Sequence, residues 1–250
     1  MRKILAGAST ILLAATVVVA GGDVWKSKPY SQWDQKDVTA VLQTSPWAKT
    51  NVTGSGAWHP ADTTPITGGS VGYAGSANDT SHVNGAMANQ AGGSEKAAAA
   101  TSGSQAYNVY WWSSRTIREA NLRSQVLKGG ITQDAADNAL KQTPDDYQVL
   151  VAGQNMSVFQ QRGEDAFKAA AFLEAKKTKK KIAPTKVEFQ KNADGKVVGV
   201  VFSFPKKDAS GEPTISPDEK EVDFDVQVAD SWLRTNFNPK QMQDSQGEDL

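Results

Sequence analysis

Residues 221–237 read EVDFDVQVADSWLRTNF, two alternating runs joined by a short turn. In the first run, apolar residues take the even positions of 222–228, and polar residues take the odd positions. Successive side chains of a strand point to opposite faces, so this alternation predicts an antiparallel sheet with one packed and one solvated face. We therefore expect Asp223 and Asp225 to lie on the solvated face.

Two earlier stretches carry the same alternation and predict a hairpin. Val187 and Phe189 alternate with charged residues, and apolar residues take the even positions of 198–204. Between them, residues 192–195 read NADG, and the glycine supplies the positive φ that tight hairpin turns need. Together with residues 221–237, these stretches predict four consecutive strands paired as an antiparallel meander.

The segment before these strands mixes strand and helix patterns. Residues 107–112 read YNVYWW and residues 147–152 are largely apolar, so both are expected to form strands. Helical patterns cover residues 114–127, 132–142 and 164–177. Ser114 can cap the first of these helices, and a pair of glycines ends it.

These patterns define the expected fold class, α+β. Residues 107–250 are predicted to form a two-layer domain with helices on one face of a mixed, mainly antiparallel sheet. The order strand, two helices, strand in its first part is typical of a βαβ unit. The second part is the meander.

Residues 1–20 have the layout of a secretory signal peptide. A cationic start precedes an uncharged apolar run over residues 4–20, and the small residues Val18 and Ala20 precede a cut before Gly21. The alternative is an uncleaved membrane anchor, because the run is just long enough to span a bilayer. No later stretch is apolar for long enough to span a membrane. We therefore expect an exported protein, periplasmic or extracellular, with no membrane span after cleavage.

Residues 21–50 are expected to form an amphipathic, Trp-rich helical arm. Asp34 and Asp37 have the spacing of a capping box ahead of a helix, and a Ser-Pro pair ends that helix. The arm holds three tryptophans, Trp25, Trp33 and Trp47. Either they dock the arm onto the main domain or they form a platform on which a ligand stacks.

Residues 51–106 differ in composition from the rest of the chain. Ten of the 21 glycines fall in this stretch, mixed with Ala, Ser and Thr, and the few apolar residues show no period of 2 or 3.6. Such a segment buries too little apolar surface to offset the entropy of ordering it. We expect a disordered, flexible linker.

Composition excludes several kinds of chemistry. The chain has no cysteine, which rules out disulfides, thiol nucleophiles and zinc–thiolate sites. Its two histidines, His59 and His82, both lie in the predicted linker without an acid at a ligand spacing. The formal net charge is zero, which argues against a nucleic-acid partner. No catalytic residue, metal site or cofactor is predicted.

The strongest candidate ligand site lies where the strand at 107–112 meets the next helix. Trp112 ends the strand, and Arg115 and Arg118 stand in the first turn of the helix. Helix N-termini bind anions, and an arginine can hold a carboxylate or phosphate through two hydrogen bonds. Trp47 of the arm is the fourth candidate ligand-binding residue. The alternative is structural, with Glu119 and Arg123 forming an ordinary i, i+4 pair.

Two further charge clusters have both a structural and a functional interpretation. Asp223 and Asp225 share a strand face at a separation that suits glycosidase chemistry, but we expect a solvated outer face instead, because Glu221 and Gln227 continue the same alternation. Five lysines between 176 and 181 are expected to neutralise the dipole at the end of the helix over 164–177. The functional alternative for these lysines is contact with an anionic envelope polymer.

Two short blocks carry a resemblance. Residues 45–48 read SPWA and residues 112–120 read WSSRTIREA, on either side of the Gly-rich stretch. This arrangement resembles a set of uncharacterised exported bacterial proteins with no established function. The resemblance implies bacterial export and a single unit that spans both ends of the linker, and it implies no chemistry.

We therefore expect an exported, non-catalytic protein that binds or assembles with another component of the cell envelope. The expected partner is an envelope protein or an anionic polymer. The alternative is a carboxylate-dependent hydrolase that acts on cell-envelope glycan or peptide.

Overall fold

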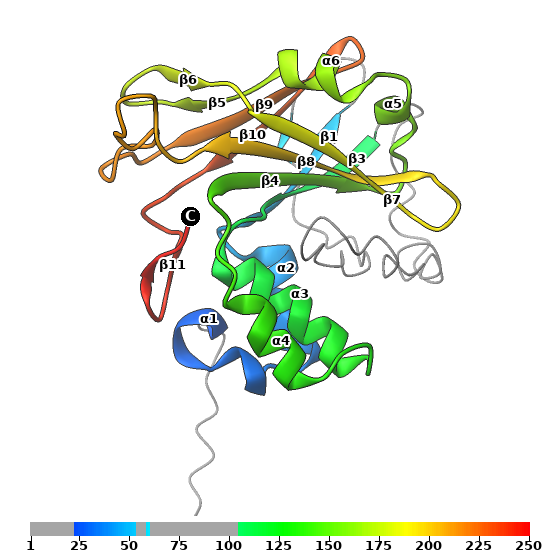
Figure 1. The fold of residues 1–250 in the computed structure, drawn as a ribbon, viewed down its shortest axis with the longest axis vertical. Helices are drawn as coiled ribbons and strands as arrows, with labels where there is room; N and C mark the ends of the chain where they lie inside the picture. Colours follow the sequence, from blue (N-terminus) through cyan, green and yellow to red (C-terminus); the bar gives the residue numbers. More distant parts are fainter. Residues whose placement is uncertain (1–22, 54–58, 61–104) are drawn as a thin grey trace, which may run out of the picture.

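The computed structural model describes residues 23–53, 59–60 and 105–250, and the fold is reported for these residues (Figure 1). The predicted signal peptide and most of the predicted linker lie outside them. The described chain is α+β and its sheets are antiparallel, as the alternation of apolar residues indicates.

The larger sheet has six strands in the order β2-β1-β3-β4-β8-β7, and every neighbouring pair is antiparallel. Its strands are β1 (Ala48–Thr53), β2 (His59–Pro60), β3 (Gln105–Trp111), β4 (Asp146–Gly153), β7 (Lys186–Lys191) and β8 (Val197–Pro205). Strand β1 joins the end of the predicted arm to the main domain. Both ends of the predicted linker therefore lie in strands of this sheet.

The smaller sheet has four strands in the order β10-β9-β5-β6, again antiparallel. Its strands are β5 (Ala171–Ala175), β6 (Lys180–Ile182), β9 (Val222–Val228) and β10 (Ser231–Phe237). A short hairpin of β11 (Gln243–Asp244) and β12 (Gly247–Glu248) ends the chain.

The two sheets pack on each other through aromatic side chains. The ring of Phe224 on β9 lies 5.2 Å from that of Phe202 and 6.2 Å from that of Phe204, both on β8. The predicted four-stranded meander is therefore wrong, because β8 and β9 belong to different sheets. The loop over residues 206–221 carries the chain from one sheet to the other, so two hairpins replace the meander.

The helices α2, α3 and α4 gather at one end of the sheets (Figure 1). The helices are α1 (Val24–Ser27), the 3₁₀ turn Tyr30–Gln32, α2 (Gln35–Thr44), α3 (Arg115–Leu127), α4 (Gln133–Leu140), α5 (Ser157–Gln160) and α6 (Glu164–Ala169). Asp34 and Asp37 form the predicted capping box, and Ser114 caps α3 as predicted. No helix within the described ranges is long and apolar enough to cross a membrane.

The predicted helix over 164–177 is wrong beyond its first turns. Helix α6 ends at Ala169, and β5 follows directly. In β5 the side chains of Ala171, Leu173 and Ala175 are buried, whereas Phe172 and Glu174 between them are not. A strand of period 2 made largely of alanine and glutamate resembles a helix in composition, and only its pairing with β9 identifies it.

The predicted βαβ unit is also wrong. Strands β3 and β4 are direct antiparallel neighbours, with Trp111 opposite Val149. The helices α3 and α4 lie between them in the chain as an inserted helical hairpin. A right-handed crossover is not needed, because an antiparallel pair can be joined at a single end of the sheet.

The turn between β9 and β10 holds an alanine in a strained backbone conformation. Ala229 has φ of 52°, in the left-handed region that favours glycine, and its neighbours Val228 and Ser231 are paired across the hairpin. We expect Ala229→Gly to stabilise the protein by about 0.5–1 kcal/mol, because glycine removes the left-handed penalty. Urea unfolding measures the change.

The matched control is Ala135→Gly on the exposed side of α4, which is expected to cost about 1 kcal/mol. If both substitutions destabilise the protein equally, the turn does not hold Ala229 in the left-handed region.

Candidate functional site

The four residues predicted to bind a ligand lie around the start of α3, and three of them are buried. Trp47 and Trp112 contribute to the core, and Arg118 is also buried. Arg115 is partly exposed. The polar groups of this cluster contact the chain itself, so ligand binding by these residues stays a prediction.

Asp249, the residue before the C-terminal Leu250, occupies the anion site that the sequence predicts at the start of α3. One carboxylate oxygen accepts the main-chain N–H of Arg115 at 2.6 Å, and the other accepts that of Thr116 at 2.8 Å. The indole N–H of Trp47 donates to the carbonyl of Asp249 at 2.6 Å. A carboxylate at this place satisfies two N–H groups that lack helical partners and offsets the helix dipole.

The two arginines are also bound within the chain. Nε of Arg115 donates to Oδ2 of Asp244 at 2.7 Å, so the C-terminal hairpin contributes a second acid to this corner. Nη2 of Arg118 donates to the carbonyl oxygens of Ala139 at 3.0 Å and Leu140 at 3.4 Å. Arg118 therefore satisfies carbonyl groups at the end of α4 and joins the two helices.

Glu119 faces the acids of this corner. Burial is the main cause that raises its pKa; Arg115 and Arg118 lower the pKa, Asp244 and Asp249 raise it, and the net value is about 7. The predicted pair with Arg123 does not form. Arg123 donates instead to the carbonyl of Trp33 at 2.7 Å and to the side chain of Gln133 at 3.2 Å.

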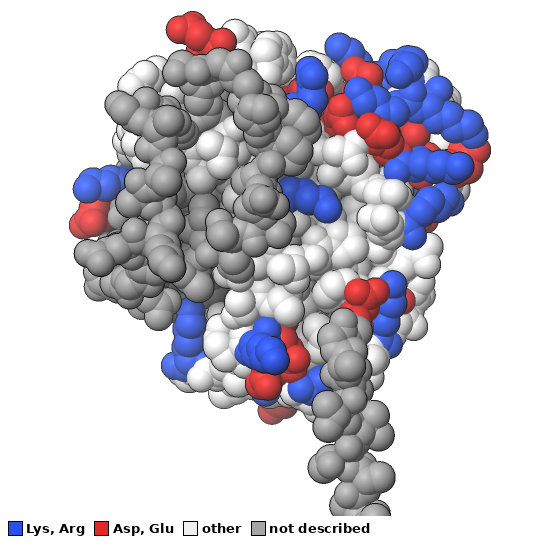
Figure 2. Space-filling model, turned by 180° about the vertical axis from the view of Figure 1, so that it is seen from behind, with Lys and Arg blue, Asp and Glu red and all other residues white. Residues whose placement is uncertain are grey.

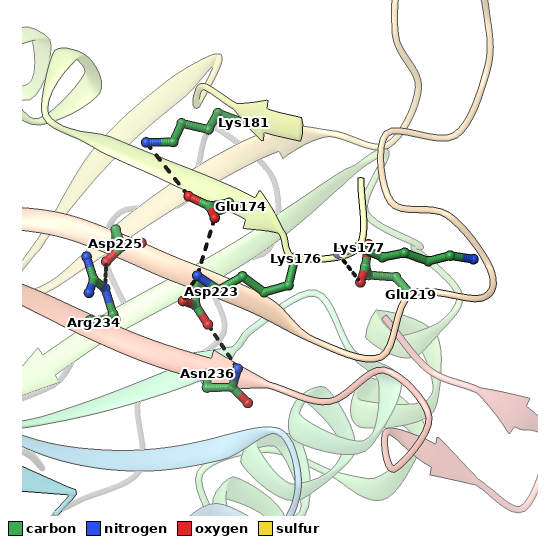
Figure 3. A network of polar contacts seen from close by, with 9 residues as sticks. All are labelled: Glu174, Lys176, Lys177, Lys181, Glu219, Asp223, Asp225, Arg234 and Asn236. Atoms are coloured by element: carbon green, nitrogen blue, oxygen red, sulfur yellow. Dashed lines mark hydrogen bonds and ion pairs between the residues drawn. The ribbon is translucent and has the colours of Figure 1, made fainter. Parts of the chain in front are cut away.

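A second polar cluster covers the side of the four-stranded sheet that faces away from the other sheet. We call it the outer face (Figure 3). Its members alternate with the residues of the same strands that face the other sheet, and Lys176 reaches it from the loop after β5. They are Phe172, Glu174, Lys176, Lys181, Asp223, Asp225, Gln227, Trp232, Arg234 and Asn236.

The prediction that Asp223 and Asp225 are solvated is wrong, since only 4% and 1% of their surfaces are exposed. Long side chains from neighbouring strands cover them. Lys176 Nζ lies 2.6 Å from Oδ2 of Asp223, and the Asn236 amide donates to Oδ1 of the same carboxylate at 2.9 Å. Arg234 forms an ion pair with Asp225 (Figure 3).

The lysines over 176–181 do not end a helix, because they surround the β5–β6 turn. Most of them contact acids: Lys176 with Glu174 and Asp223, Lys177 with Asp218, Lys180 with Asp208 and Lys181 with Glu174. Figure 2 shows basic and acidic side chains mixed at the corner that this hairpin occupies in Figure 1. The dipole of a helix end therefore does not explain the run.

Charges of the outer face are arranged in two layers. The carboxylates lie beneath, with side-chain exposures of 2% for Asp225 and 17% for Glu174. Their partners lie outside, at 54% for Arg234 and 60% for Lys181. Acids reached only past cations are shielded from substrate, so the face does not present a general acid and base.

Trp232 is the most exposed aromatic feature of the outer face. Its surface is 45% exposed, and its ring lies 5.9 Å from that of Phe172 at 59°. Lys181 Nζ lies 4.1 Å from the centre of the Phe172 ring. The sequence could have indicated this exposure, because Trp232 takes the same alternating positions as Arg234 and Asn236, which are the polar positions of an amphipathic strand.

Comparison with known proteins assigns no family to the chain. No protein-family model, no curated protein and no solved structure matches it. The resemblance to exported bacterial proteins through the SPWA and WSSRTIREA blocks stays a prediction. Within the residues that the structure describes, no group of three or more acidic or imidazole side chains could hold a metal ion.

The contacts of Asp249 predict a structural role. We expect Asp249→Ala to lower the free energy of unfolding by about 2 kcal/mol, because two buried N–H groups lose their acceptor. Glu248→Ala, an exposed neighbour on the same hairpin, is the matched control and is expected to change stability by less than about 0.5 kcal/mol. Equal effects of the two substitutions in urea unfolding would contradict this role.

Glu119 predicts a pH dependence of stability. Its pKa in the folded protein, about 7, is above the ordinary value of 4.5, so its contribution is complete at low pH and is lost as the pH rises from 4.5 through 7. Glu119→Gln keeps the uncharged form. We expect it to stabilise the protein by about 1–2 kcal/mol at pH 8 and to have little effect at pH 4.

Thermal or urea unfolding at the two pH values measures this difference. The control is Glu212→Gln, which replaces an exposed glutamate in the loop before β9. A gain at pH 8 that persists unchanged at pH 4 would mean that ionisation of Glu119 is not its cause.

Proposed function

We propose that the protein is an exported, non-catalytic binding protein that contacts another component of the cell envelope through the outer face of the four-stranded sheet. The exposed Trp232 is the observation that supports this most directly. It lies on a regular strand, beside Phe172, rather than singly on a loop. Export itself rests on the signal-peptide pattern of residues 1–20.

The chemistry of the outer face favours recognition. Tryptophan and arginine are the residue types that contribute most often to binding energy at interfaces, and Trp232 and Arg234 point the same way from one strand. The ion pair with Asp225 holds Arg234, and the Phe172 ring lies beside Trp232, before a partner arrives. Such preorganisation lowers the entropic cost of binding.

The alternative, a carboxylate-dependent hydrolase, receives less support from the same residues. Asp223 and Asp225 are both buried and both contact cations or amides. Burial raises the pKa of Asp225, while Arg234 opposes the rise. A substrate would have to displace these partners before it could reach either carboxylate, so binding is the simpler use of the face.

The test is co-sedimentation of the chain from Gly21 onward with a sedimentable cell-envelope preparation. We expect Trp232→Ala to lower the bound fraction at least tenfold. Leu127→Ala is the matched control, because Leu127 is also a large exposed hydrophobic residue, at 40%, but lies on α3. If wild type does not sediment with the envelope, or if Trp232→Ala sediments as wild type does, the proposed function is wrong.

A further inference from the structure

We infer that the partner of the outer face is an acidic polysaccharide, whose sugar rings stack on Trp232 and whose carboxylate or phosphate groups contact Arg234, Lys176 and Lys181. This inference rests on the proposed function and names its ligand. It follows from the depth at which the cations and the carboxylates lie, from the position of the exposed Trp232 ring and from the net charge of the whole face.

The charges of the outer face are layered, with cations outside and carboxylates beneath. A ligand that approaches the outer face meets the cationic heads of Arg234 and Lys181, exposed at 54% and 60%, before any carboxylate. Lys176 is 31% exposed and bridges Glu174 and Asp223. Because the acids lie beneath, the layer that a ligand contacts is complementary to an anion.

The hairpin at the side of this face continues the same chemistry. Lys177 and Lys180 are exposed at 58% and 40%. Lys179 lies in the turn with a φ of 57°, in the left-handed region. A residue other than glycine keeps this conformation only where the surrounding structure constrains it. Acidic side chains mix with the lysines at this corner (Figure 2), so the hairpin extends the cationic layer less strongly than Arg234 and Lys181 do.

Trp232 lies close to a cation of this layer. It lies two residues from Arg234 on the same side of β10, which sets the two side chains about 7 Å apart along the strand. An indole ring offers a flat apolar surface to the C–H face of a sugar, and the nearby guanidinium offers paired donors to a carboxylate or phosphate. A polymer of charged sugars supplies both groups at short, regular intervals.

The outer face differs from the surfaces that bind nucleic acids and proteins. Its cations are matched by Glu174, Asp223 and Asp225 and it has one widely exposed ring, whereas a nucleic-acid surface combines a basic groove with several rings on which successive bases stack. A protein partner favours a wide apolar centre. The outer face has one widely exposed ring, and Lys181 lies over its neighbour Phe172.

Affinity electrophoresis of the chain from Gly21 onward tests the inference, with polygalacturonate as the acidic probe and dextran as the neutral one. We expect polygalacturonate to retard the wild type and dextran to leave it unretarded. Trp232→Ala should weaken binding at least tenfold. Lys181→Gln should weaken it about threefold to fivefold, and added salt should weaken wild-type binding.

Lys186→Gln is the matched control for charge, because Lys186 is also 60% exposed and paired with an acid, but lies on β7 of the other sheet. Leu127→Ala is the control for apolar surface. Lys181→Gln leaves the buried carboxylates Asp223 and Asp225 with their partners. A difference between Lys181→Gln and Lys186→Gln therefore does not arise from disruption of the ion pairs of Asp223 and Asp225. Thermal unfolding checks that each variant keeps its fold.

Each outcome separates the inference from the proposed function. Suppose that sedimentation with the envelope depends on Trp232 but that polygalacturonate does not retard the protein, or that protease treatment of the envelope abolishes binding. Either result overturns the acidic polysaccharide as the ligand and leaves the binding role. Equal retardation by dextran, or equal effects of Lys181→Gln and Lys186→Gln, also overturns it. Sedimentation that does not depend on Trp232 overturns the proposed function itself.

Discussion

The carboxylate of Asp249 on the N-terminus of α3 is the contact around which one end of the molecule is organised. It binds the main chain of Arg115 and Thr116, and its own carbonyl accepts the indole N–H of Trp47. Three distant segments therefore meet at one buried acid: the Trp-rich arm, the helix after β3 and the chain terminus. An unpartnered helix N-terminus among buried groups would be costly, so the C-terminal hairpin is part of the fold.

This contact also accounts for what the candidate site at Trp47, Trp112, Arg115 and Arg118 does in the structure. The anion-binding geometry inferred there exists, but the chain supplies the anion. Arginines that looked available in the sequence hold Asp244 and the carbonyl groups at the end of α4. The outer face of the four-stranded sheet, where Trp232 is exposed on the same strand as the ion-paired Arg234, is therefore the stronger candidate recognition surface.

Local patterns were predictive where local interactions dominate, and they were wrong where a distant segment decides the outcome. The caps at Asp34 and Ser114 and the hairpin turn at 192–195 depend on neighbouring residues, and all form as expected. The strand at Ala171–Ala175 was predicted as a helix, because its alanines fit either structure until β9 pairs with it. The prediction that Asp223 is solvated was also wrong, because Lys176 and Asn236 reach it from other segments.

The sequence by itself determined the fold class, the antiparallel pairing within the β7–β8 and β9–β10 hairpins and the absence of thiol chemistry, since these follow from residue types and their spacing. Tertiary structure alone decided that the strands divide between two packed sheets, that Asp249 occupies the start of α3 and that cations cover the carboxylates of the outer face. The physical reason is separation along the chain: Trp47 and Asp249 are 202 residues apart and share one hydrogen bond. No local pattern specifies which distant group satisfies a buried donor or charge.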